Sequence, residues 1–72
     1  MRLKGKEYAV YNPSGKLVGS FDGEVIYIQG KPLYNVEGDT VYAFGVPGDF
    51  IGNITVNAIK TINGLVLYNL ES

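Results

Sequence analysis

Apolar residues along this chain stand in short runs, and glycine, proline, asparagine or aspartate interrupts each run after a few positions. No long segment repeats apolar residues at the spacing of a helix. Short apolar runs with partial alternation, bounded by turn-forming residues, are typical of β-strands joined by tight turns. The pattern therefore predicts an all-β chain of eight short strands, arranged as four hairpins.

One pattern recurs in each hairpin: an apolar residue, then Gly or Tyr, then Ser or Asn, then an apolar residue. It occupies residues 18–21, 33–36, 51–54 and 67–70. An apolar residue begins each larger unit upstream, and a glycine follows it within a few positions. Repeated units cannot bury their apolar faces alone and pack on their copies. We expect a single all-β domain over residues 1–72, with repeats at about 10–25, 26–40, 41–58 and 59–72.

Turn chemistry supports these boundaries. Turn signals occur at residues 12–15, 22–23, 29–31, 37–39 and 63–64, and Asn63-Gly64 is the strongest signal for a two-residue hairpin. The third repeat departs from the others, because Gly48-Asp49-Phe50 is an insertion and residues 55–57 replace an Asp-Gly type of turn. At the chain ends, residues 8–11 can pair beside the last strand. The N- and C-terminal strands would then close a ring and remove exposed strand edges.

Period-two alternation sorts the second strand of each hairpin into two faces. The uncharged face is expected to be core, with the glycines making room for the tyrosine rings of the other copies. Its members are Leu17, Gly19, Phe21, Pro32, Tyr34, Val36, Phe50, Gly52, Ile54, Val66, Tyr68 and Leu70.

The opposite face of the same strands carries one apolar residue in every copy: Val18, Leu33, Ile51 and Leu67. With 46% apolar residues in 72 positions, the chain has more apolar surface than one small core absorbs. Contiguous apolar surface left outside a core usually marks an interface. These four residues are therefore the predicted oligomer interface, and the expected partner is a second copy in a homo-oligomer.

Composition excludes much chemistry. The chain has no Cys, His or Trp, and six basic and seven acidic residues give a net charge of −1. Nucleophilic or acid–base catalysis near neutral pH would have to rely on carboxylates, lysines and tyrosines alone. We expect no enzyme activity, no cofactor and no metal site. No signal-peptide pattern follows the N-terminus, so a cytoplasmic protein without membrane contact is expected.

Two candidate binding sites remain open. Tyr11, Tyr27 and Tyr42 occupy equivalent positions, with Lys60 as the fourth, and could stack on a sugar or nucleotide or instead pack in an interface. The turn carboxylates Asp22, Glu24, Glu37 and Asp39 could hold a cation, although solvated turn residues are the favoured interpretation.

Nucleic acid is not favoured as a partner. A basic strip of Lys4, Lys6, Lys16 and Lys31 is conceivable, but carboxylates interleave with it along the chain. A net charge near zero also provides no long-range attraction for a polyanion.

The glycine-turn hairpins, with residues 26–39 as the cleanest copy, resemble the domains called the 4-fold beta flower. The resemblance covers residues 8–72 and departs at the insertion in the third repeat and at Lys60. It implies four β-hairpins arranged about a pseudo-fourfold axis. It implies no activity, cofactor or catalytic residue.

Overall fold

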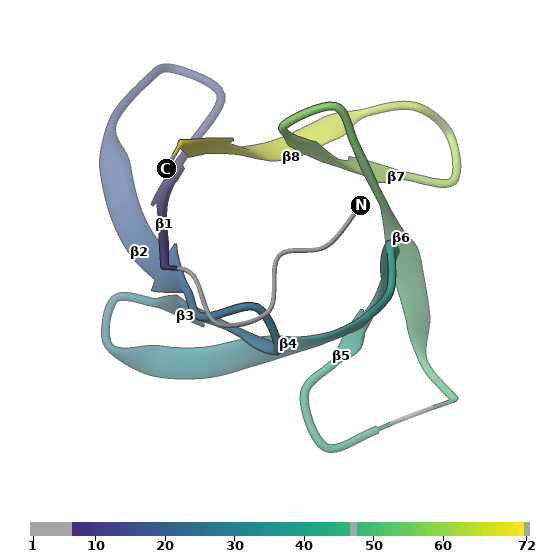
Figure 1. Ribbon diagram of the computed structural model, residues 1–72. Helices are drawn as coiled ribbons and strands as arrows, with labels where there is room; N and C mark the ends of the chain where they lie inside the picture. Colours follow the sequence, from purple (N-terminus) through teal and green to yellow (C-terminus); the bar gives the residue numbers. More distant parts are fainter. Residues whose placement is uncertain (1–6, 47, 72) are drawn as a thin grey trace.

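Eight antiparallel strands close into a barrel in the computed structural model, which describes residues 7–46 and 48–71 (Figure 1). Each strand pairs with its neighbours in sequence, and β8 returns to β1. This confirms the expected all-β fold of four hairpins. The strands are β1 (Tyr8–Tyr11), β2 (Leu17–Phe21), β3 (Val25–Ile28), β4 (Lys31–Glu37), β5 (Thr40–Ala43), β6 (Phe50–Thr55), β7 (Ala58–Thr61) and β8 (Val66–Glu71).

Closure of the barrel pairs the first strand with the last, as the sequence predicted. Val10 of β1 pairs with Leu70 of β8, and the pairing extends one residue to either side. Both partners are buried members of the core, so the closing seam is as apolar as the rest of the barrel interior. A closed barrel leaves no unpaired strand edge.

The barrel has two distinct ends. The loops within the repeats, which follow β1, β3, β5 and β7, define what we call the hairpin end, and in Figure 1 they flare outward around the ring. The turns between repeats, which follow β2, β4 and β6, define the linking end, where β1 also begins and β8 ends. Gly15, Gly30, Gly45 and Gly64 have φ between 76° and 89° in the hairpin loops. Only glycine adopts this conformation without steric cost, which explains its recurrence in every repeat.

The loop around Asn63-Gly64 differs from the expected two-residue hairpin. β7 ends at Thr61 and β8 begins at Val66, so residues 62–65 form the loop. The Thr61 Oγ1 accepts hydrogen bonds from the backbone N–H groups of Asn63 and Leu65, at 3.3 and 3.2 Å. This side-chain cap stabilises a wider turn. Two-residue connections occur instead at residues 29–30, 38–39 and 56–57.

The insertion in the third repeat also lies elsewhere than expected. Phe50 is the first residue of β6 and pairs with Tyr42, just as Leu17 of β2 pairs with Tyr11. Phe50 therefore belongs to the repeat itself, and the extra residues lie in the loop before it.

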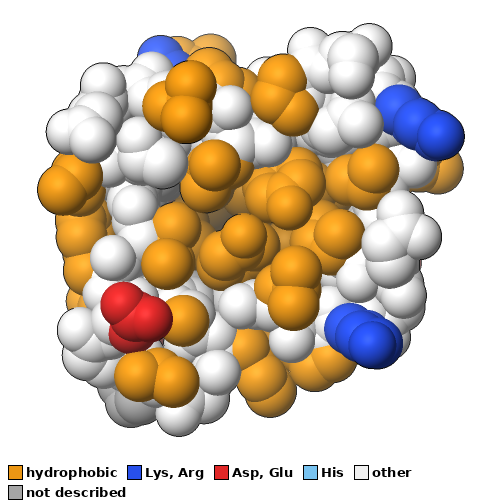
Figure 2. Space-filling model, turned by 180° about the vertical axis from the view of Figure 1, so that it is seen from behind, with side chains coloured by type: hydrophobic (Ala, Val, Ile, Leu, Met, Phe, Trp, Pro, Cys, Tyr) orange, Lys and Arg blue, Asp and Glu red, His pale blue; other side chains and the backbone are white. Residues whose placement is uncertain are grey.

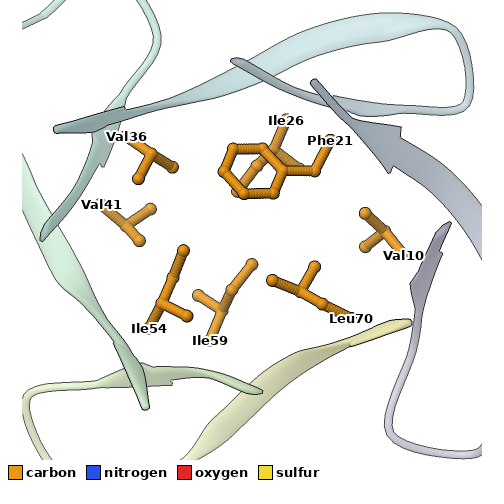
Figure 3. Packing of buried hydrophobic residues seen from close by; sticks show 8 residues of the cluster. All are labelled: Val10, Phe21, Ile26, Val36, Val41, Ile54, Ile59 and Leu70. Carbon is orange, nitrogen blue, oxygen red and sulfur yellow. The ribbon is translucent and has the colours of Figure 1, made fainter. Parts of the chain in front are cut away.

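Each repeat contributes two side chains to one central core (Figure 3). One comes from the first strand of the hairpin and one from the end of the second strand, and all point inward. The eight are Val10, Phe21, Ile26, Val36, Val41, Ile54, Ile59 and Leu70.

A β-bulge interrupts every hairpin at the same place. The register shifts after Val10, Ile26, Val41 and Ile59, directly beyond the core residue of the first strand. A bulge places two residues of one strand opposite one of the other, so the alternation of faces changes beyond it.

The bulges correct the predicted face assignment at the start of each second strand. Leu17, Pro32 and Phe50 were expected in the core and are exposed. Conversely, Val18, Ile51 and Leu67 were expected on the opposite face and pack against the core cluster. Simple alternation holds only between the bulge and the linking end, where Phe21 and its equivalents are buried.

Tyr34 and Tyr68 come from opposite repeats and meet across the interior. Their ring centroids lie 6.1 Å apart at an interplanar angle of 61°, an edge-to-face arrangement that aromatic pairs favour. Gly19 and Gly52 hold the equivalent positions in the other two repeats. A Cβ at Gly19 would overlap the carbonyl oxygen of Tyr27 in the next strand, and one at Gly52 would overlap that of Lys60. The glycines are therefore needed for close strand approach, in addition to any room they leave for the rings.

Candidate functional site

Charge is divided between the two ends of the barrel. The carboxylates of the inter-repeat turns and of the described chain ends lie at the linking end, whereas Asp49 lies in a hairpin loop. Lys16 and Lys31 lie at the hairpin end, and both are exposed. Lys4 and Lys6, the other members of the basic strip, lie outside the described residues. The linking-end carboxylates are Glu7, Asp22, Glu24, Glu37, Asp39 and Glu71.

The hairpin end is instead strongly apolar. Figure 2 looks onto this face and shows hydrophobic side chains gathered over its middle around a small hollow, with lysines toward the edge. Of the large hydrophobic residues that are exposed in the described part of the chain, only Val56 belongs to the linking end. Those near the hairpin end are Leu17, Leu33, Phe44, Val46, Phe50, Ile62 and Leu65.

The four predicted interface residues all lie toward this end of the barrel. Leu33 is exposed, with 40% of its surface accessible. Val18, Ile51 and Leu67 are half-buried and rest on the core cluster. These three side chains therefore lie between the core and the apolar surface of the hairpin end. The exposed hydrophobic residues of the loops, which extend this surface outward, were missed, because loop positions carry no strand alternation.

The three tyrosines and Lys60 lie on separate hairpins around the barrel. Each is half-buried, and each follows a buried core residue of its strand. Across the hairpin they pair with Leu17, Pro32, Phe50 and Val66, respectively. The four side chains thus come from β1, β3, β5 and β7, one from each hairpin of the ring.

Tyr42 packs against its cross-strand partner Phe50, and this contact stabilises the hairpin. Its ring meets that of Phe50 edge-on, with centroids 6.3 Å apart. Cross-strand aromatic pairs of this kind stabilise a sheet by a few tenths to about 1 kcal/mol. Part of the tyrosine repetition is therefore structural.

An open groove of about 420 Å³ runs beside Tyr11. Its lining includes the carboxylates of Glu7 and Glu71, together with Ser20 and Ala9. The small Ala9 side chain helps to leave the surface of β1 hollow. An aromatic ring beside carboxylate and hydroxyl groups can bind a polyhydroxylated ligand through stacking and hydrogen bonds.

Among residues 7–46 and 48–71, two ionisable groups have shifted pKa values, and neither shift provides a catalyst for neutral pH. Backbone N–H groups of Val25 and Glu24 donate to Asp22 Oδ1 at 2.8 and 2.9 Å and lower the pKa of this carboxyl. Burial, with smaller contributions from Tyr68, raises the pKa of Tyr34. Both shifts lead away from neutrality, where acid–base catalysis requires a group to titrate.

Within the described residues, no three His, Cys, Asp or Glu side chains are grouped so that they could hold a metal ion. The turn carboxylates are accordingly spread around the linking end. The described part of the chain also contains no helix long and apolar enough to cross a membrane.

The fold and its two ends define the class as a closed, eight-stranded antiparallel barrel built from four hairpin repeats. Comparison of the chain with protein-family models finds no match. Comparisons with curated proteins and with solved structures find none either.

Proposed function

We propose that the protein is a small structural or protein-interaction module that self-associates through its hairpin end and catalyses no reaction. The observation that supports this proposal is the segregation of the exposed surface. Large apolar side chains gather at one end of the barrel, while carboxylates line the other. A contiguous apolar patch is unfavourable in water and is favourably covered by a complementary apolar surface.

Light scattering coupled to size-exclusion chromatography tests the proposal. The full-length chain is expected to elute as an oligomer at micromolar concentration. Ile62→Ser combined with Leu65→Ser should shift it to the monomer, because both side chains are exposed at the hairpin end. A matched control is Val56→Asn, which removes an apolar side chain that is 81% exposed at the linking end. The control should remain oligomeric. A monomeric wild-type chain would refute the proposal.

The chain is also proposed to belong with the 4-fold beta flower domains. Support comes from its four hairpins and their arrangement in one closed ring. We propose a cytoplasmic location, consistent with the absence of cysteine from the sequence.

A second candidate function is binding of a small sugar or nucleotide, and the groove beside Tyr11 favours it. In this groove, Tyr11 of the first repeat lies together with Glu7 and Glu71. Titration of the chain with a panel of sugars and nucleotides, followed by NMR, is expected to shift resonances of residues that line the groove. Tyr11→Ala should abolish these shifts, while Tyr27→Ala, the repeat-equivalent control, should retain them. Equal loss in both variants would contradict a site in this groove.

A further inference from the structure

We infer that two copies dock hairpin end to hairpin end about a twofold axis, with Lys31 of each copy opposite Asp49 of the other. This inference rests on the proposed self-association and specifies its geometry. The proposed dimer has one interface surface, one twofold axis and one of the rotational registers that the repeats permit.

The distribution of charge selects the surface. Two linking ends would bring their carboxylates together, and like charges placed opposite one another oppose association. A head-to-tail stack would place the same carboxylates against the apolar hairpin end of the next copy, and removing charged groups from water is costly. Two hairpin ends instead cover apolar surface with apolar surface. Glu7 and Glu71, the first and last described residues, lie at the linking end and therefore away from this face.

The size of the face is compatible with a specific dimer. The molecule measures 29 × 27 × 23 Å along its principal axes. One end of such a molecule offers on the order of 500 Å², so two ends bury roughly 1,000 Å², near the lower limit of specific interfaces. A dimer of modest affinity is expected.

Pseudo-fourfold repetition leaves four ways to rotate one copy on the other, and charges at equivalent positions distinguish them. Each second strand begins at or just after one exposed residue. In the four repeats in order, these residues are Lys16, Lys31, Asp49 and Leu65.

In a face-to-face pair the repeats of the two copies run in opposite directions around the common axis. One register places the second repeat opposite the third and the first opposite the fourth. It creates two Lys31–Asp49 contacts, related by the twofold axis, and leaves Lys16 opposite Leu65. At these four equivalent positions, no like charges meet in this register.

Every other register carries a penalty. Placing the first repeat opposite the third gains two Lys16–Asp49 contacts but brings the two Lys31 side chains together. In one of the two remaining registers, Lys16 of each copy faces Lys31 of the other. In the last register, Lys16 faces the Lys16 of the second copy, and Asp49 faces the Asp49 of the second copy. Because like charges directly opposite are unfavourable, the Lys31–Asp49 register is preferred.

Sedimentation equilibrium of charge variants tests the register. Lys31→Glu should weaken the dimer roughly tenfold, since two attractive contacts become repulsive. Lys16→Glu changes an equivalent exposed lysine and should leave the dimerisation constant within about twofold. Combining Lys31→Glu with Asp49→Lys should restore the wild-type constant, because the charges are exchanged and the contact is kept.

The outcomes separate this inference from the proposed function. If Ile62→Ser with Leu65→Ser dissociates the oligomer but the charge exchange restores nothing, the hairpin-end interface stands and the register is wrong. Weakening by Lys16→Glu but not by Lys31→Glu would likewise overturn the register. A wild-type chain that stays monomeric overturns both proposals. An oligomer larger than a dimer would refute the closed twofold geometry.

Discussion

At the scale of single residues, glycine has two different structural roles in this barrel. In the hairpin loops it provides left-handed backbone conformations, which the positive φ of Gly15 and its equivalents shows. At Gly19 and Gly52 the backbone is not left-handed, and the carbonyl of the adjacent strand occupies the space of a side chain. The sequence showed these two glycines alternating with tyrosines but could not show the carbonyl, because it belongs to another strand.

Gly19→Ala is expected to destabilise the protein by about 3 kcal/mol, since the added methyl group must displace backbone. Urea unfolding followed by circular dichroism measures the loss. Gly48→Ala is the matched control, because nothing lies within 4 Å of a Cβ added there. It should alter the free energy of unfolding by less than about 0.5 kcal/mol. Equal effects of the two substitutions would contradict the close strand approach.

Val56 is a second informative residue, because it has a φ of 54° in an exposed turn. This conformation is a genuine outlier for a β-branched side chain. Gly38, with a φ of 62°, holds the same place in the turn between β4 and β5. Val56→Gly is therefore expected to stabilise the protein by about 1 kcal/mol. The reciprocal Gly38→Val should cost a similar amount in the same unfolding assay, and a destabilised Val56→Gly would refute the argument.

At the scale of elements, the sequence predicted the eight strands, the hairpins and the inner residues near the linking end. It failed where the bulges intervene. Nothing in the alternation around Leu17 or Val18 marks the bulge, because both residues are apolar and either could face inward. The failure also affected the candidate surface, since Val18 is half-buried while Leu17 is 59% exposed. The groove beside Tyr11 was missed for a related reason: it is lined by residues from β1, β2 and β8, and β8 is distant from the other two in the sequence.

The turn between β2 and β3 carries a pH-dependent contribution to stability. Asp22 accepts two backbone N–H groups, which lower its folded-state pKa below the ordinary value of 3.8. The carboxylate therefore stabilises the fold above that ordinary value, and the contribution is lost as the pH falls through the folded-state pKa.

Asp22→Asn should thus have a lower urea midpoint than wild type at neutral pH, because a neutral amide oxygen is a weaker acceptor. The difference should shrink in acid, as the wild-type carboxyl becomes protonated. Urea midpoints measured across the acidic range test this expectation. A difference that does not depend on pH would show that charge at this position is unimportant.

At the scale of the whole molecule, stability depends on closure. β8 pairs with both β7 and β1, so its loss would expose two strand edges and remove Leu70 from the core. The sequence predicted this pairing of the first and last strands, and with it the dependence of the fold on closure.

Truncation after Leu67 is expected to unfold the chain rather than shorten it. The removed segment contains Tyr68, which meets Tyr34 across the interior, and Leu70, which pairs with Val10. A collapsed amide-proton spectrum by NMR is the expected result. A well-dispersed spectrum from the truncated chain would mean that the other hairpins suffice.

The meeting of Tyr34 and Tyr68 also bears on how such a barrel can be inherited or designed. Four tyrosines could not share the space that two rings fill at a centroid distance of 6.1 Å, and four glycines would leave it empty. The smallest unit that can be tiled is therefore a pair of hairpins, one with glycine and one with tyrosine. A gene that encodes one such pair could yield the barrel as a dimer of half-length chains, and a consensus design should duplicate the pair and not the single hairpin.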